Sequence, residues 1–351
     1  MRLSRWWRYG AVAVVAFLLF AGIGTGSAQQ AGKVVVNGYG GAWDKHMTEQ
    51  VIKPFEQRYN IKVELIPLFS AEAFTRLRAT KGRPDLDVVV FSGGQEIPAF
   101  REGLIDRLDP KLIPNMNRVY SLARFKDDIS VIAIFATTAI IYNTEKIQRA
   151  PTSFKDFWRP EFKGRVTIPD MTNTSGVEFL LMAAKVNGAK AAADIEPGFK
   201  ALAELKPNLV TAFGKVAQME QLFTQGSAWM TWYSNTYAAD YKAKGLPVGF
   251  AVPREGASAT QVTINLVKDA PSRENAIRFI NWFLDATPQA AFSRASLYAP
   301  TNRDAKLPPD VAAKVISYGE ENIKKLVPTD WEVVNRLRAD WTKRWNELMA
   351  R

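Results

Sequence analysis

Hydrophobic residues follow two alternating patterns from about residue 33 onward. Short runs rich in β-branched residues, typical of strands, occur at residues 33–40, 61–68 and 86–94. The segments between them, 42–60 and 71–82, have helical spacing, and the first places Met47, Val51 and Phe55 four residues apart. This order of strands and helices predicts an α/β fold in which helices cover a mostly parallel sheet.

The run ISVIAIFATTAIIYN, around residues 129–142, is too long for one ordinary strand. We interpret it as a strand that leaves one sheet, crosses between Ala136 and Ala139, and enters a second sheet. A second α/β unit follows it, and a further crossover is possible near residues 258–266. The pattern therefore predicts two lobes with a cleft between them. Lobe 1 comprises residues 33–137 with 266–310, and lobe 2 comprises residues 138–265 with 311–351.

The last predicted helix has the clearest amphipathic pattern. The tetrapeptide TDWE is a capping box, with Thr329 as the N-cap and Glu332 at the third helical position. Apolar residues then recur every three or four positions at Trp331, Val334, Leu337, Trp341, Trp345 and Leu348. An aromatic stripe at this spacing is typical of internal packing. No coiled-coil seam is evident, so we expect a monomer.

The first 28 residues have the order of a secretory signal. Three arginines precede the apolar run AVAVVAFLLFAGIG, and the small residues TGSA follow it. We expect cleavage near Ala28 and export of the mature chain to the periplasm. The alternative is an uncleaved anchor, although the apolar run is short for a membrane span. The chain contains no cysteine, which excludes disulfides and thiolate metal sites.

The formal net charge of +11 falls to about +8 when the three arginines of the signal are removed. The remaining basic residues are scattered, and none forms a run of five. A nucleic-acid-binding surface has clustered basic residues. We therefore expect no nucleic-acid partner.

Familiar catalytic motifs are missing from the sequence. His46 is the only histidine, so a Ser-His-Asp triad would depend on it, and a zinc hydrolase would lack ligands. The dinucleotide fingerprint fails because Trp43 stands where its third glycine belongs. We expect no cofactor, no metal and no enzymatic activity. An exported hydrolase with a carboxylate pair is the alternative from another class, because 35 acidic residues offer many pairs.

The stretch VVVNGYGGAW joins the first strand to the first helix through three glycines. Glycine permits positive φ and a close approach of the backbone to a ligand. Backbone N–H groups at such a junction attract anionic or polar groups. The loop is therefore either a ligand-binding loop or a plain tight turn.

Several stretches occur in an order that is known from one family: VNGYGGAW, DLDVVVFSGG, IIYNTEKI, PTSFKDFWRPEFKGRVTIPD, MTWYSNTYAADYKAKGLPVGFAVPREGA, APSRENAIRFINWFLDATPQAAFSR and LYAPTNRDA. Together they resemble the periplasmic solute-binding proteins of ABC importers, most of all the spermidine/putrescine group, with thiamine and iron binders as relatives. The resemblance implies a two-lobed clamshell of the type II periplasmic-binding fold. It also implies a small-molecule solute in the cleft and an inner-membrane permease with its ATPase as partners.

In such folds the ligand groups come from loops at strand ends that face the cleft. The resemblance therefore implies these candidate ligand-binding residues: Tyr39, Gly40, Gly41, Trp43, Ser92, Gly93, Gln95, Thr172, Asn173, Thr174, Ser175, Trp232, Ser234, Asn235, Glu255 and Tyr298. Structural roles are the alternatives. Tyr298 and Trp232 are also candidates for the core, the Thr/Asn/Ser run for a helix cap, and Glu255 for a solvated turn.

The class of solute follows less directly. Polyamine binders balance ammonium groups with several acids, whereas only Asp170 and Glu255 lie near the predicted cleft. Hydroxyl and amide side chains stand where carboxylates are expected. We predict a polyamine-like or thiamine-like amine or a zwitterion, with an anionic phosphonate, opine or carboxylate as the alternative. A sensor that engages a membrane receptor instead of a permease would share these sequence features.

Overall fold

The computed structural model describes residues 32–350, so the predicted signal peptide lies outside the described residues. Ten strands form one mixed sheet. They are β1 (Gly32–Gly38), β2 (Ile61–Pro67), β3 (Val88–Phe91), β4 (Val131–Asn143), β5 (Val166–Pro169), β6 (Leu209–Phe213), β7 (Met230–Ser234), β8 (Val248–Ala251), β9 (Ser258–Leu266) and β10 (Ala299–Pro300).

The strand order is β2-β1-β3-β9-β4-β7-β5-β6, and β8 and β10 both pair with β4. β1 lies parallel to β2 and β3, and β5 lies parallel to β6 and β7. The strands between these two parallel groups, β9 and β4, are antiparallel to their neighbours. The predicted α/β class is confirmed, and the βαβαβ order at the start of the chain produces the first parallel group.

β4 is the long apolar run that the sequence suggested was a crossover. All of its residues except Tyr142 are buried. Residues 131–138 pair with β9 along one edge of β4, and residues 138–142 pair with β7 along the other edge, so Thr138 pairs with both strands. The strands therefore form one hydrogen-bonded sheet rather than the two separate sheets that we predicted, because β4 lies between β9 and β7 and pairs with both.

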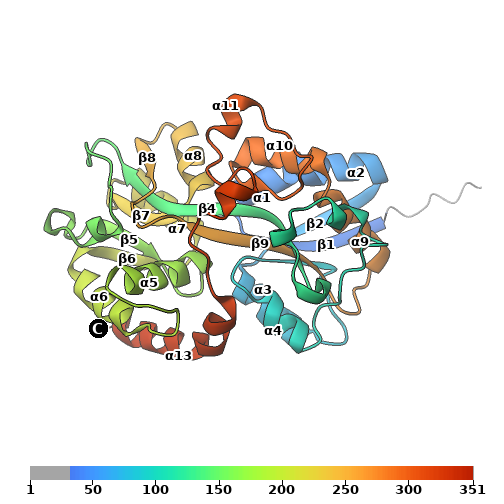
Figure 1. The fold of residues 1–351 in the computed structure, drawn as a ribbon, viewed down its shortest axis with the longest axis horizontal. Coiled ribbons are helices and arrows are strands. Elements are labelled where there is room, and N and C mark those ends of the chain that lie inside the picture. The colour runs from blue at the N-terminus through green and yellow to red at the C-terminus, as the bar shows by residue number, and fades with distance from the viewer. Residues whose placement is uncertain (1–31, 351) are drawn as a thin grey trace, which may run out of the picture. The chain divides into compact units, whose positions relative to one another are not determined.

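The helices lie on both sides of this sheet. They are α1 (Gly41–Met47), α2 (Lys53–Tyr59), α3 (Ser70–Ala79), α4 (Glu96–Arg101), α5 (Thr174–Val186), α6 (Glu196–Leu205), α7 (Val216–Thr224), α8 (Asn235–Ala243), α9 (Arg273–Phe283), α10 (Ala286–Ser296), α11 (Pro309–Ala312), α12 (Glu320–Ile323) and α13 (Trp331–Ala350). Figure 1 shows α1, α8 and α10 above the strands in that view, and α4, α5 and α13 below them.

The helix predicted over residues 42–60 is present with an irregular middle. A π-helical segment, Thr48–Ile52, joins α1 to α2. α2 ends at Tyr59, and Asn60 follows as its C-cap in the left-handed conformation with φ 51°. Met47, Val51 and Phe55 are all fully buried, as their spacing predicts. The π-helical segment keeps the apolar stripe on the core side while it shifts the register.

The last helix, α13, packs its tryptophan stripe inward. Trp331, Trp341 and Trp345 are buried in the main core, which confirms the predicted internal packing. The predicted capping box is wrong, because the helix begins one residue later than that motif requires. Asp330, not Thr329, caps the helix, since its carboxylate accepts from the backbone N–H of Val333 at 3.1 Å.

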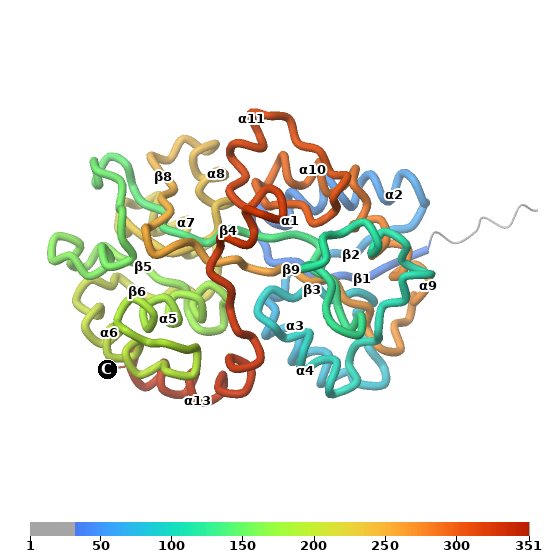
Figure 2. The backbone as a smooth tube through the Cα atoms, in the orientation of Figure 1, coloured from blue at the N-terminus to red at the C-terminus, as the bar shows by residue number. Residues whose placement is uncertain are grey.

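The chain reaches α13 by a long connection that passes, in the view of Figure 2, from the α10 side of the sheet to the α13 side. Once there, α13 contacts two loops that are far apart in the sequence. Asn335 donates to the carbonyl of Gly94 at 2.7 Å, and Arg338 donates to the carbonyl of Gly93. Farther along the helix, Trp345 donates to the carboxylate of Asp170 at 3.2 Å. The helix thus contacts the loop after β3 and the loop after β5.

Candidate functional site

A cavity of about 50 Å³ lies where the ends of β1, β3 and β7 meet the start of α5. Most of its wall consists of hydroxyl groups and aromatic rings. The lining residues are Tyr39, Phe69, Ser70, Ser92, Ala136, Thr138, Thr172, Asn173, Thr174, Ser175, Tyr233, Ser234, Tyr237, Thr260, Val262 and Tyr298. The wall therefore combines donors and acceptors for polar groups with apolar faces for a carbon skeleton.

Half of the sequence-predicted site residues meet in this cavity. They are Tyr39, Ser92, Thr172, Asn173, Thr174, Ser175, Ser234 and Tyr298. They come from both parts of the chain that flank β4. The rule that ligand groups follow strand ends accounts for the agreement, because Tyr39 follows β1, Ser92 follows β3 and Ser234 ends β7.

Gly40, Gly41 and Trp43, at the junction of β1 and α1, lie behind the lining residues. Gly40 and Gly41 have φ 79° and 59°, so they form the turn into α1 that other residues would strain. Trp43 is 1% exposed, and its ring lies 5.0 Å from that of Tyr39 and 5.7 Å from that of Tyr298. Trp43 therefore supports two lining tyrosines from behind.

Gly93, Gln95 and Asn235 border the lining residues in a similar way. A Cβ atom on Gly93 would lie 2.8 Å from the hydroxyl of Thr174, so only glycine lets these loops come so close. Gln95 is 4% exposed, and Asn235 donates to the carbonyl of Leu297 at 3.0 Å. These residues hold the wall in place rather than face the cavity.

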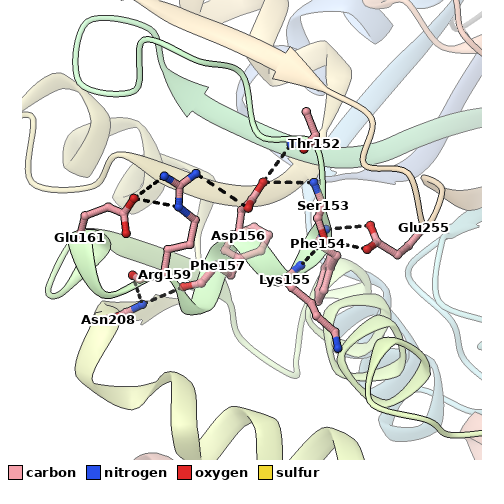
Figure 3. Close-up of polar contacts among 10 residues, drawn as sticks. All are labelled: Thr152, Ser153, Phe154, Lys155, Asp156, Phe157, Arg159, Glu161, Asn208 and Glu255. Carbon is pink, nitrogen blue, oxygen red and sulfur yellow. Dashed lines mark hydrogen bonds and ion pairs between the residues drawn. The ribbon is translucent and has the colours of Figure 1, made fainter.

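Trp232 and Glu255 lie away from the cavity. Trp232 is fully buried, and its ring packs 5.0 Å from that of Phe154. Glu255 accepts from the Ser153 hydroxyl at 2.7 Å and from the Phe154 N–H at 2.9 Å, as Figure 3 shows. These hydrogen bonds hold the pKa of Glu255 below its usual range in spite of partial burial. They tie the Glu255 carboxylate to the start of the short helix Phe154–Trp158.

Several lining residues were not predicted from the sequence: Phe69, Ser70, Ala136, Thr138, Tyr233, Tyr237, Thr260 and Val262. Phe69 and Ser70 follow β2 and carry the same strand-end signal as Ser92, so this signal could have found them. Thr138 and Thr260 lie within β4 and β9, and no local signal marks them. Their place in the wall depends on long-range strand pairing.

Hydroxyl groups on one side of the cavity form a continuous chain. Tyr39 lies 3.4 Å from Ser70, Ser70 lies 3.2 Å from Ser92, and Ser92 lies 3.1 Å from Thr174, measured between hydroxyl oxygens. Ser92 also donates its N–H to Ser70 at 2.9 Å. The chain joins the loops after β1, β2 and β3 to the first turn of α5.

The opposite wall has two further pairs. Ser234 donates to the phenol oxygen of Tyr298 at 3.1 Å, and Asn173 donates to the phenol oxygen of Tyr233 at 2.9 Å. Asn173 also caps α5, since its side chain accepts from the N–H of Ser175 at 3.0 Å. The capping role that the sequence offered as an alternative is therefore present at Asn173.

No charged side chain lines the cavity within the described part of the chain. Burial raises the pKa of Tyr39 and of Tyr298 well above the usual range, and it raises that of Tyr233 to about 12. The phenols therefore stay neutral and can donate. Behind Tyr39, Asp44 accepts from the backbone N–H of Tyr39 at 2.8 Å, and burial raises the pKa of Asp44.

An ion pair joins α3 to the start of α7 beside the lining residue Phe69. Lys215 lies 2.7 Å from Glu72, and its ammonium group lies 5.1 Å from the centre of the Phe69 ring. Glu72 in turn accepts from the N–H of Phe69 at 2.8 Å. Both charged side chains are largely exposed, so this contact lies at the surface.

The family of bacterial extracellular solute-binding proteins matches residues 50–317 of the chain. The chain belongs to this family. The resemblance inferred from the sequence is thereby confirmed. Binding proteins of ABC importers bind small solutes and deliver them to a membrane permease.

Individual relatives agree with this assignment. The spermidine/putrescine-binding periplasmic protein of Escherichia coli is 24% identical over 299 residues, which cover 82% of this chain and 81% of that protein. An ABC transporter structure from Clostridium perfringens is 25% identical with a TM-score of 0.69, covering 90% of this chain and 99% of that one. A binding protein from A. tumefaciens B6, solved with glucopine, is 20% identical with a TM-score of 0.78. The match covers 90% of this chain and 99% of that chain.

These likenesses describe transporter binding proteins, which are not enzymes. Within residues 32–350 no helix is long and apolar enough to cross a membrane. The same part of the chain holds no cluster of three or more side chains suited to a metal ion.

Proposed function

We propose that this solute-binding protein is a periplasmic receptor that captures a small polar organic solute in the cavity and delivers it to an ABC permease with its ATPase. The supporting observation is that the wall is shared by strand-end residues from both sides of β4, joined by the hydroxyl contact between Ser92 and Thr174. Tyrosine rings would hold the carbon skeleton of the solute, and hydroxyl and amide groups would fix its polar ends.

The two predicted lobes are part of this proposal. The boundary between residues 137 and 138 is supported by Thr138, where the pairing of β4 with β9 ends and its pairing with β7 begins on the opposite edge. The assignment of residues 311–351 to one lobe is less simple, because α13 contacts the loops after both β3 and β5. A solute shifts the lobes toward a closed arrangement only by binding that arrangement more strongly than the open one. The Ser92–Thr174 contact is one that closure would form.

We assign the solute to the amines or zwitterions. The cavity is small and has no charged side chain, which disfavours a long polyamine with several ammonium groups. The named spermidine/putrescine relatives support a cationic class. An anionic solute is the second candidate, because the first turn of α5 borders the cavity and a helix N-terminus attracts anions. The glucopine-bound neighbour has the same fold.

A thermal-unfolding assay on residues 29–351 tests the receptor function. Solute is first removed by partial unfolding and refolding, and the protein is then heated with polyamines, thiamine, amino acids, opines, phosphonates and dicarboxylates. A solute at a hundred times its dissociation constant stabilises the fold by roughly 2.7 kcal/mol. We expect such a shift, together with compaction in X-ray scattering. A complete lack of shifts across the panel would contradict the proposal.

A variant pair ties the binding to this cavity. Thr174→Val removes the hydroxyl that contacts Ser92, and we expect at least about tenfold weaker binding. Thr75→Val is the matched control, since Thr75 is an exposed α3 residue whose hydroxyl bonds only locally to Ala71. Equal binding by both variants would place the site elsewhere. Turnover of chromogenic glycosides or esters would instead favour the hydrolase.

A further inference from the structure

The first half of α13 holds the loop that follows β3. Arg338 donates to the carbonyl of Gly93, whose neighbour Ser92 lines the cavity. Next along the loop, Gly94 has a φ of 78° and lies so near Trp331 that a Cβ atom would be only 2.5 Å from that side chain. Only glycine fits at this position, so the loop and the helix are in close contact here.

The second half of α13 holds the loop that follows β5. Trp345 donates to one carboxylate oxygen of Asp170 at 3.2 Å, and the other oxygen accepts from the N–H of the lining residue Thr172 at 2.8 Å. Arg344 adds an ion pair with Glu196 of α6 at 2.7 Å. This half of the helix is therefore bound to the elements around β5.

The two contacts lie on one continuous helix of 20 residues. Arg338 and Trp345 are seven residues apart, which corresponds to about two turns and about 10 Å along the helix axis. The two loops that they hold meet at the cavity, where the hydroxyl oxygens of Ser92 and Thr174 lie 3.1 Å apart. The helix therefore fixes the spacing between two loops that form this part of the wall.

Arg338 interacts with a buried acid as well as with the loop. Glu96 at the start of α4 is 1% exposed and accepts from the hydroxyl of Thr263 at 3.3 Å. Burial raises the pKa of Glu96 to about 7, and the positive charge of Arg338 opposes this rise. Burial also lowers the pKa of Arg338 to about 10, and Glu96 opposes that fall. The guanidinium group therefore stays charged at neutral pH, and its charge favours its place beside α4.

We propose, on the basis of the receptor function above, that Arg338 is a positioning residue that fixes the loop after β3 on α13 and thereby sets how long the cavity retains its solute. It does not line the cavity, so it acts through Gly93 and Ser92 rather than by touching the solute. Without Arg338, the loop loses the contact that keeps the Ser92 hydroxyl within reach of Thr174. The wall would then open between these two residues, and the solute would leave faster.

Amide hydrogen exchange of the solute-free protein, followed by mass spectrometry, measures the support of the loop directly. The N–H of Ser92 donates to the hydroxyl of Ser70 at 2.9 Å, so it exchanges when the loop moves away. Arg338→Met removes a charged hydrogen bond, and exchange in the segment 88–97 should become at least about tenfold faster. Arg338→Lys keeps a positive donor and should restore most of the protection. Arg336→Met is the matched control, since Arg336 is an exposed arginine of the same helix.

Stopped-flow fluorescence with putrescine and γ-aminobutyrate, one amine and one zwitterion, measures the effect on the solute. For a probe that the wild-type protein binds, Arg338→Met should raise the dissociation rate at least about tenfold, and it should change the association rate much less, because contacts within a formed complex act mainly on dissociation. Arg338→Lys should lie near the wild type, and Arg336→Met should match it. Thermal melts confirm that each variant is folded.

The outcomes separate this inference from the receptor function. Unchanged exchange in Arg338→Met, or equal acceleration in Arg336→Met, would overturn the positioning role whatever solute the receptor carries. Faster exchange with an unchanged dissociation rate of a bound probe would also overturn it, since the loop would not then control the solute. If the wild-type protein bound neither probe, the assigned solute class would fall, and the exchange measurement alone would support or overturn the role of Arg338.

Discussion

Substitution of Asn37 tests whether its side-chain hydrogen bonds fix the strand ends that border the cavity. Asn37 is fully buried at the end of β1, and its side chain makes three hydrogen bonds to the backbone. It accepts from the N–H of Val90 at 2.7 Å, donates to the carbonyl of Val90 at 3.0 Å, and donates to the carbonyl of Leu68 at 3.1 Å. These contacts join three neighbouring strand ends just before they reach the cavity.

The change Asn37→Ala removes all three bonds and leaves their backbone partners buried. At about 1 kcal/mol for each bond, the free energy of unfolding should fall by about 3 kcal/mol. A domain of about 320 residues unfolds with an entropy near 0.7 kcal/mol per degree, so the melting temperature should fall by about 4 °C. Solute affinity should also fall, because Phe69, Ser70 and Ser92 follow the tethered strands.

Differential scanning calorimetry of the solute-free protein measures this change. Asn187→Ala is the matched control, since Asn187 is exposed and makes one local bond to Ala183 at the end of α5. Its effect should stay below about 0.5 kcal/mol. If the two variants melted within a degree of each other, the buried bonds of Asn37 would not stabilise this corner of the fold as argued.

Three further predictions concern substitutions of single residues. Tyr298→Phe removes the phenol oxygen that accepts from Ser234, and calorimetry should show affinity reduced by roughly tenfold with little change in melting temperature. Gly94→Ala places a Cβ atom 2.5 Å from Trp331 at a φ of 78°, so it should destabilise the fold by more than about 2 kcal/mol, whereas Gly40→Ala, at a φ of 79° with no neighbour within 4 Å, should cost about 1 kcal/mol in denaturant unfolding. The raised pKa of Glu96 means that the folded state binds a proton more tightly than the unfolded state, so its contribution to stability is present at pH 4 and is lost as pH rises through about 7. Melting temperatures from pH 4 to pH 8 should therefore fall less in Glu96→Gln, and an unchanged slope would contradict this assignment.

Local sequence signals predicted the elements that depend on local chemistry. The alternation of apolar runs and helical spacing gave β1, α1 and the following strands, and the strand-end rule brought Tyr39, Ser92 and Ser234 to the cavity. Tyr39 and Ser92 share one cause, since β1 and β3 are adjacent parallel strands that end at the same edge of the sheet. Ser234 reaches the cavity from the second parallel group, because β7 runs in the opposite direction to β3.

Features that depend on the pairing of strands far apart in the chain could not be predicted from the sequence. Which face of β7 borders the cavity depends on the strands that pair with it, and the sequence alone does not show this. We therefore predicted Trp232 as a site residue, whereas its neighbour Tyr233 lines the cavity. Thr138 and Thr260 become neighbours only through the pairing of β4 with β9. Glu255 follows a strand like the other candidates, but the Ser153 hydroxyl and the Phe154 N–H direct its carboxylate away from the cavity.

The surface ion pair between Glu72 and Lys215 has a practical consequence. It joins α3 and α7 beside a lining residue, and both side chains are accessible. Because the chain has no cysteine of its own, a cysteine introduced at each of these two positions would be the sole attachment points for a pair of dyes. Because the two side chains are in contact, a pair of pyrene labels would report the separation of the two helices through their excimer emission as solute is added. The same doubly labelled protein would serve as an optical sensor for whatever solute it carries.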